Sequence, residues 1–180
     1  MALSATIFKA TLQISDMDRG YYHEHALTLA RHPSETDERM MVRLVAYCLH
    51  ANAALAFGKG LSTDDEPDLW QKDLTGEIEV WIDVGQPDER RMRKACNRAR
   101  RVFVYTYSGR GAALWWDQVG KSATAQNLTV IDLPAPGTKA LAGLAQRSMR
   151  LQVTIQDGQV WVADQDRVVQ VDLAARTAVR

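Results

Sequence analysis

The sequence has no excess of charge of either sign and very little cysteine. Lys and Arg together number 22, as do Asp and Glu, so the formal net charge is zero. This balance argues against a protein that binds nucleic acid through its bulk charge, so any basic surface must be local. At 180 residues the chain has the length of one domain, and it can bury a core without metal or disulfide staples.

Only two cysteines are present, Cys48 and Cys96, and each falls in a helical pattern with apolar neighbours. Such thiols are usually small buried hydrophobes, and reduced cysteines are typical of a cytoplasmic protein. No stretch has the length of a membrane span, and residues 1–16 lack the basic start and apolar run of a signal peptide. We therefore expect a cytoplasmic protein with no membrane partner.

Hydrophobic patterns predict strands that alternate with helices, which indicates an α/β core. Ser34 with Asp37 forms a capping signal before a long amphipathic helix. The other predicted helices lie at about 21–31, after Pro87, at 112–120 and at 139–148. The predicted strands lie at 6–14, 54–60, 77–84, 102–107 and 128–133, followed by a C-terminal meander at 151–155, 160–163 and 168–173.

The segment 78–84 is the most informative of these strands. Successive strand residues point to opposite sides, so one side carries the aliphatic residues at 78, 80, 82 and 84. The other side carries Glu79, Trp81 and Asp83. Because an unpaired buried charge costs several kcal/mol, by rough estimate, Asp83 is expected to bind a ligand or to pair with a cation.

An acidic loop precedes this strand, with the sequence Asp64-Asp65-Glu66-Pro67-Asp68. A Pro-Asp pair, a strand with an acid and then a helix resemble the order of the PD-(D/E)XK nuclease core. In that core two carboxylates hold a divalent cation, and a lysine lies two residues after the second acid. Here that position is Gly85, so the pattern is incomplete.

Four strings resemble the bacterial YaeQ proteins. They are residues 29–40 (LARHPSETDERM), 65–70 (DEPDLW), 85–91 (GQPDERR) and 154–161 (TIQDGQVW). The resemblance implies one YaeQ-like domain over residues 1–180, on a variant of the PD-(D/E)XK restriction-endonuclease-like fold. It implies a mixed central sheet flanked by helices, with a nuclease-like core over about 1–148 and a β-meander over about 149–175. It implies no known substrate.

Asp68 and Asp83 are the best candidates for a metal site, because two carboxylates could bind Mg²⁺ or Mn²⁺. Glu38 heads the buried stripe of its helix and matches the glutamate that nucleases of this fold often add to the metal site. The alternative is structural: Asp68 would cap a turn, and Asp83 would pair with an arginine such as Arg91. Glu35 is expected nearer solvent, as a partner of the helix dipole.

Three residues could replace the missing lysine: Gln86, Lys94 and Arg91. Gln86 could orient water but has no charge. The helical pattern places Lys94 on the exposed face. Arg91 lies beside the apolar stripe, and it could stabilise a phosphate transition state although it cannot act as a base.

A basic cluster follows Pro87, and its members are Arg90, Arg91, Arg93, Lys94, Arg98, Arg100 and Arg101. It could bind a nucleic-acid backbone, or it could be a solvated helix face that pairs with nearby acids such as Asp88 and Glu89. His23 and His25, placed on a helix, would point to different sides and make a poor metal pair.

Three hypotheses follow. The first is a Mg²⁺- or Mn²⁺-dependent nuclease or phosphodiesterase that uses Asp68, Asp83 and Glu38, with Arg91 or Gln86 near the lost lysine. The second is a non-catalytic module of the same fold in a regulatory role, which binds nucleic acid or protein. The third is a scaffold that binds a protein partner through its C-terminal meander.

Overall fold

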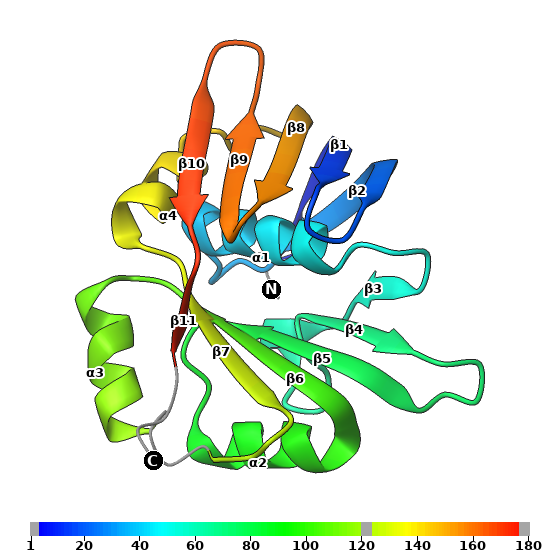
Figure 1. Cartoon of the computed structure of the whole chain (residues 1–180), viewed down its shortest axis with the longest axis vertical. Coiled ribbons are helices and arrows are strands. Elements are labelled where there is room, and N and C mark those ends of the chain that lie inside the picture. Colours follow the sequence, from blue (N-terminus) through cyan, green and yellow to red (C-terminus); the bar gives the residue numbers. More distant parts are fainter. Residues whose placement is uncertain (1–3, 120–123, 177–180) are drawn as a thin grey trace. The chain divides into compact units, whose positions relative to one another are not determined.

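The computed structural model describes residues 4–119 and 124–176, which form two mixed β-sheets with helices (Figure 1). Contacts within the chain divide it into two compact units, residues 1–49 with 134–173 and residues 50–133 with 174–180. The first unit thus combines an N-terminal segment with one from near the C-terminus. The second unit combines the middle of the chain with its last residues.

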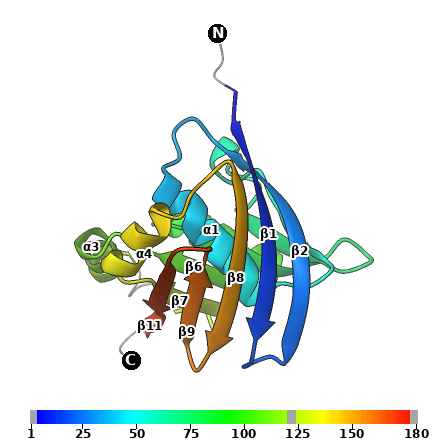
Figure 2. The same cartoon turned by 90° about the horizontal axis from the view of Figure 1, so that it is seen from above.

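The first unit contains a five-stranded sheet in the order β10-β9-β8-β1-β2. Its elements are β1 (Thr6–Asp16), β2 (Tyr21–Arg31), α1 (Asp37–His50), α4 (Ala135–Ala142), β8 (Ser148–Gln156), β9 (Gln159–Ala163) and β10 (Val168–Asp172). Strand β1 pairs antiparallel with β2 and parallel with β8. Helix α1 lies across one face of this sheet (Figure 2). Strand β1 alternates accordingly, with Phe8, Ala10, Leu12 and Ile14 buried.

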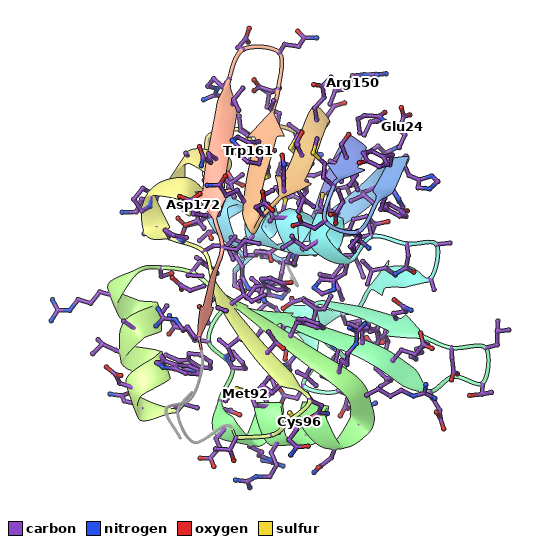
Figure 3. The ribbon with its side chains drawn as sticks, viewed as in Figure 1. Glu24, Met92, Cys96, Arg150, Trp161 and Asp172 are labelled. Atoms are coloured by element: carbon purple, nitrogen blue, oxygen red, sulfur yellow. The ribbon has the colours of Figure 1, made fainter. Side chains whose placement is uncertain are left out.

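The second unit contains a six-stranded sheet in the order β11-β7-β6-β5-β4-β3. Its elements are β3 (Leu55–Phe57), a 3₁₀ turn (Gly60–Ser62), β4 (Leu69–Lys72), β5 (Ile78–Val84), α2 (Glu89–Arg98), β6 (Ala99–Thr106), α3 (Arg110–Gln118), β7 (Leu128–Asp132) and β11 (Ala174–Arg176). Strands β5, β6 and β7 are parallel, so helical crossovers connect them. Met92 and Cys96 mark the face of α2 that packs on this sheet (Figure 3).

Residues 21–31 form strand β2, so the prediction of a helix there is wrong. Asp16 pairs with Tyr21 across a four-residue turn that ends at Gly20, whose φ is +64°. The Asp16 carboxylate accepts hydrogen bonds from the backbone N–H and the side chain of Arg19, which fixes the turn. Pairing with β1 therefore decides the conformation of this segment, and it places His23 and His25 on the same side of the strand.

The other predicted elements agree in type, although several of their bounds differ. The strand expected at 54–60 covers only Leu55–Phe57 and is followed by the 3₁₀ turn, and strands β4 and β11 were not predicted. The helix expected at 139–148 ends at Ala142, because Pro134 and Pro136 start α4 early and β8 begins at Ser148. The long helix α1 begins at Asp37, where the hydroxyl of Thr36, not of Ser34, accepts the hydrogen bond of the Arg39 N–H. The helix predicted at 112–120 corresponds to α3, and its predicted end at residue 120 lies outside the described residues.

The mixed α/β class is confirmed, but the structure has two mixed sheets in place of the one central sheet that was expected. The C-terminal meander pairs with β1 and so builds a sheet of its own with the N-terminal hairpin. Both cysteines are free, Cys48 fully buried and Cys96 partly buried, and burial raises the pKa of each thiol.

Among the described helices, none combines the length and the apolar character that crossing a membrane requires.

Candidate functional site

The carboxylates of Asp68 and Asp83 lie where β4 and β5 run side by side in the second unit. The antiparallel register pairs Leu69 with Ile82. Asp68 directly precedes Leu69, and Asp83 directly follows Ile82. If the antiparallel register is continued by one residue, the two acids therefore lie opposite each other. Each is only 3% exposed. Two buried carboxylates this close repel each other unless a cation or several donors compensate them.

Asp68 is fixed by the backbone around it. Its Oδ2 accepts a hydrogen bond of 2.8 Å from the N–H of Val84 at the end of β5. Gly60 approaches from the other side, and a Cβ on that glycine would lie 2.5 Å from Oδ1 of Asp68. The loop around Gly60 also bonds to the backbone of Pro67. A side chain at position 60 would therefore displace the Asp68 carboxylate.

Asp83 forms a two-pronged ion pair with Arg91. The Nε of Arg91 donates to Oδ2 at 2.9 Å, and its Nη2 donates to Oδ1 at 3.0 Å. The indole N–H of Trp81, on the same face of β5, adds a third bond of 3.0 Å to Oδ2. Planar pairing of this kind uses both oxygens of the carboxylate. Of the interpretations left open by the sequence, the structure contains the Asp83–Arg91 pair.

Arg91 lies in the first turn of α2, which places its side chain beside Asp83. Asp88 caps the helix by accepting from the N–H of Arg91 at 2.7 Å. The guanidinium also donates to the carbonyl of Glu66 in the acidic loop, at 3.0 Å. Burial alone would lower the pKa of Arg91, but the hydrogen bond and charge of Asp83 and the charge of Asp68 raise it. The guanidinium is therefore the counter-charge of both carboxylates.

This donor set, as it stands, does not fit a divalent cation. Mg²⁺ demands near-octahedral oxygen coordination, usually with one or two free carboxylates. Here Arg91 occupies both oxygens of Asp83, and a backbone N–H occupies one oxygen of Asp68. Within residues 4–119 and 124–176, no three His, Cys, Asp or Glu side chains are grouped so as to hold a metal ion.

Glu38, the third predicted ligand, belongs to the first unit, whereas Asp68 and Asp83 belong to the second. In its own unit the Glu38 carboxylate accepts a bond of 3.3 Å from the hydroxyl of Thr138 in α4. Within the second unit, the structure brings Asp68, Asp83 and Arg91 together.

Gly85 and Gln86 follow directly after β5. Gly85 has φ +105°, a conformation that side-chain-bearing residues rarely adopt, although the space beside it is open. Gln86 is exposed, and its amide lies close to Gly111 at the start of α3. A lysine at position 85 would therefore be strained by the backbone itself.

The basic cluster on α2 is largely paired with nearby acids. Arg93 pairs with Glu89 at 2.8 Å, and Lys94 pairs with Asp65 at 2.6 Å. Arg98 donates to the backbone carbonyl of Asp65 at 2.8 Å. Arg100 pairs with Glu77 at 2.8 Å, whereas no ion pair is seen in the described structure for the exposed side chains of Arg90, Arg98 and Arg101. Lys94 is partly exposed, as predicted, but it is not free.

One charged group that the sequence analysis placed near solvent is buried. Glu35 is 7% exposed and bonds to the guanidinium of Arg43 at 2.7 and 2.9 Å, with Arg39 pairing at 2.5 Å. The expectation that Glu35 is a simple dipole partner is therefore wrong. The signal that could have found this pair is the regular four-residue spacing of Glu35, Arg39 and Arg43, although Glu35 itself precedes α1.

Comparisons with known proteins agree on a single family. The sequence model of the YaeQ protein family matches residues 1–173. The chain is 46% identical over 176 residues to proteins called uncharacterized protein YaeQ from Escherichia coli (strain K12) and from Salmonella typhi, covering 97% of each chain.

Solved structures extend the likeness to three dimensions. The crystal structure of the YaeQ protein from Xanthomonas axonopodis pv. citri is 52% identical, with a TM-score of 0.93 over 98% of this chain and 100% of that chain. The crystal structure of the YaeQ protein from Pseudomonas syringae is 38% identical, with a TM-score of 0.91 over 96% of each chain. The chain therefore belongs to the YaeQ family.

Proposed function

We propose that this protein is a non-catalytic module on a variant of the PD-(D/E)XK nuclease fold, and that it acts in regulation by binding a partner. The observation that carries the proposal is the pairing of Asp83 with Arg91. A guanidinium takes the place that a divalent cation would need, so the buried acids are compensated without a metal. The positive φ of Gly85 at the position of the usual lysine supports the same reading.

The nuclease origin is supported by the order and position of the acids. Pro67 and Asp68 lead into β4, Asp83 is the last but one residue of β5, and α2 follows. Chemistry at this site would require a free carboxylate pair and a cationic group beside attacking water. Here the guanidinium of Arg91 is already bound to Asp83, which favours a protein that has kept the nuclease fold and lost its catalytic activity.

The partner is a protein and not a nucleic acid. Nucleic-acid backbones bind through unpaired cations that release counterions. Arg91, Arg93, Lys94 and Arg100 of the basic cluster are in ion pairs, which lowers the charge available for a phosphate backbone, and the whole chain is neutral. A surface of alternating paired charges is typical of a solvated or protein-facing helix.

Removing Arg91 tests the proposal. Arg91→Ala should lower the melting temperature, because Asp83 is left buried without its cation at a cost of about 3–5 kcal/mol. Added Mg²⁺ at millimolar concentration should then restore part of the loss, on the order of a few °C, by binding the exposed acid pair. The unmodified protein should melt at the same temperature with Mg²⁺ and with chelator.

Lys94→Ala is the matched control, because Lys94 pairs with the exposed Asp65 and not with the buried acids. It should change neither the melting temperature nor the response to Mg²⁺ appreciably.

A second candidate is the metal-dependent nuclease, and it is favoured by the position of Asp68 and Asp83, each one residue beyond the Leu69–Ile82 pair. If Mg²⁺ or Mn²⁺ raises the melting temperature of the unmodified protein, and Asp83→Asn abolishes the rise, the non-catalytic proposal is wrong. Cleavage of single- or double-stranded DNA or RNA with Mn²⁺ that stops in Asp68→Ala would establish the nuclease in its place.

A further inference from the structure

In the first unit, strand β8 runs beyond the end of its neighbour β9. Strand β8 pairs with β1 from Ser148 to Ile155, whereas it pairs with β9 only from Gln152 to Gln156. The first four residues of β8, Ser148–Leu151, thus have a strand on one edge and none on the other. We call this open edge the β8 notch.

The backbone groups that face the notch can be assigned from the register. The carbonyls of Arg147 and Ile155 accept bonds from β1, at 2.8 Å each, so the odd-numbered residues of β8 point their backbone toward β1. The even-numbered residues point the other way, and those from Gln152 onward bond to β9. The N–H and C=O groups of Ser148 and Arg150 therefore point into the notch, two donors and two acceptors at strand spacing.

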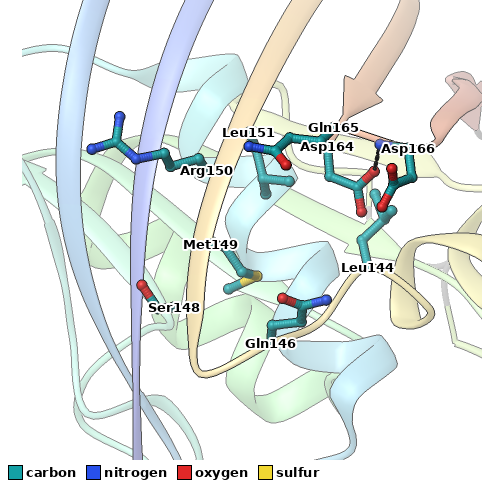
Figure 4. A pocket seen from close by; sticks show the side chains of 9 residues that line it. All are labelled: Leu144, Gln146, Ser148, Met149, Arg150, Leu151, Asp164, Gln165 and Asp166. Carbon is teal, nitrogen blue, oxygen red and sulfur yellow. Dashed lines mark hydrogen bonds between the residues drawn. The ribbon is translucent and has the colours of Figure 1, made fainter.

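A pocket of about 290 Å³ lies at the notch (Figure 4). Leu144, Met149 and Leu151 are buried and give it an apolar side. Its polar lining consists of Gln146, Ser148, Arg150, Asp164, Gln165 and Asp166. A second pocket of about 340 Å³ adjoins it, because the two share Arg150, Leu151, Asp164 and Gln165.

The far wall of the notch is the β9–β10 turn, which is held by its own hydrogen bonds. The Asp164 carboxylate accepts from the N–H groups of Asp166 and Arg167 at 2.8 and 2.7 Å, and these bonds lower the pKa of Asp164. Arg167 in turn donates to the carbonyl of Gly143 after α4, at 2.6 Å. These bonds turn the chain away at Ala163, so β9 does not extend over the notch.

We propose that the β8 notch binds an extended peptide segment of a partner protein, which adds to the sheet in line with β9 and directs a basic side chain toward Asp166. A row of two donors and two acceptors on a strand edge complements an extended backbone, as in other cases of strand addition. Side chains of the bound segment would alternate between the apolar side at Met149 and the polar side at Arg150.

The exposed carboxylate of Asp166 favours a basic residue in the bound segment. Asp164 and Asp166 lie on one side of the pocket and Arg150 lies on the other, and Asp164 is already paired with Arg167 at 3.8 Å. Asp166 is exposed, and no ion pair to it is seen among the described residues, so a lysine or arginine of the segment can reach its carboxylate. This inference rests on the proposed function only in that it names the partner of the binding module, and the Mg²⁺ melts and a peptide titration test the two separately.

The test is a titration of the full-length ¹⁵N-labelled protein with a blocked five-residue peptide of alternating lysine and valine. Amide shifts should be confined to residues 148–151 and 163–166, and hydrogen exchange at Ser148 and Arg150 should slow at least tenfold at saturation. The same peptide with its alternate amides N-methylated should bind at least tenfold more weakly, because it cannot complete the ladder.

Variants at position 150 distinguish the contribution of the backbone N–H to peptide binding from that of the side chain. Arg150→Pro removes one of the two N–H groups that point into the notch and leaves the ladder to β1 intact, so peptide affinity should fall at least tenfold. The control Arg150→Ala keeps that N–H and should bind within about threefold of the unmodified protein. Asp166→Asn should weaken the lysine peptide severalfold and leave a serine–valine peptide unchanged.

Equal binding of the N-methylated peptide, or shifts located elsewhere, would overturn the proposal even if Arg150→Pro did not fold. Absence of any shift at millimolar peptide would overturn it as well. If the notch amides instead shift with protein concentration alone, as the chain dimerises, the occupant is a second copy of this chain and the partner-peptide proposal is wrong.

Discussion

His25 is held between two tyrosine hydroxyls. Its Nε2 lies 2.7 Å from the hydroxyl of Tyr21, and its Nδ1 lies 2.8 Å from that of Tyr47 on α1. A neutral imidazole can accept from one hydroxyl and donate to the other. Burial, and then the charge of His23, lower the pKa of His25, while burial raises the pKa of Tyr47 to about 12. The fold thus favours the neutral form of both rings.

This pKa shift makes the stability of the protein depend on pH. Because the pKa of His25 is lower in the folded chain than the ordinary 6.5, the unfolded chain binds the proton more readily. The free energy of unfolding should be fully retained above pH 6.5 and should fall as the pH drops below it, by at most about 1.4 kcal/mol per pH unit for this group, until the folded pKa is passed. Urea unfolding at pH 8, 7, 6 and 5 measures the slope.

The slope should be smaller in His25→Gln, whereas His32→Gln, a change in the loop before α1, should keep it. Parallel curves for the unmodified protein and His25→Gln would show that His25 does not contribute.

At the scale of an element, helix α1 is anchored at its start by a buried ion pair. Arg43, on the second turn, reaches back to Glu35 with two bonds and also donates to the carbonyl of Ala30 in β2, at 3.2 Å. Both side chains are at most 7% exposed, so the pair fixes where the chain passes from β2 into the helix. Breaking a buried pair leaves the other charge uncompensated.

Glu35→Ala should therefore lower the free energy of unfolding by about 3–5 kcal/mol. Glu89→Ala offers a matched control, because its pair with Arg93 lies on an exposed helix face, and the change should cost no more than about 0.5 kcal/mol. Chemical denaturation of both variants measures the difference. Similar small losses in the two variants would mean that Glu35 does not anchor the helix.

At the scale of the molecule, the first unit needs both ends of its sequence. Strand β1 lies between β2 and β8 in its sheet, so without the meander residues 6–16 lose their parallel neighbour. The fragment 1–148 ends where β8 begins. It should therefore leave the β8-facing edge of β1 unpaired and fail to fold cooperatively, in contrast to a nuclease-like core that is stable without residues 149–175.

Circular dichroism melts and a ¹⁵N spectrum of fragment 1–148 measure this directly. A cooperative melt with dispersed amide signals would show that the core is independent of the meander.

The sequence alone determined the mixed α/β class, the family resemblance and the types of most elements, because hydrophobic periodicity and capping signals act within a few residues. It also determined that Asp83, an acid on a buried strand, must have a partner. Only the tertiary structure decided that this partner is Arg91, since the start of α2 must be placed against β5 for the pair to form.

The same distinction explains the segment 21–31 and the two sheets. Local propensity leaves helix and strand close in free energy for that segment, and pairing with β1 decides between them. The joining of β1 to β8 is a contact between residues some 140 positions apart, which no local pattern encodes. The sequence therefore determined what each segment can form, and long-range pairing decided which surfaces, including the β8 notch, are left open.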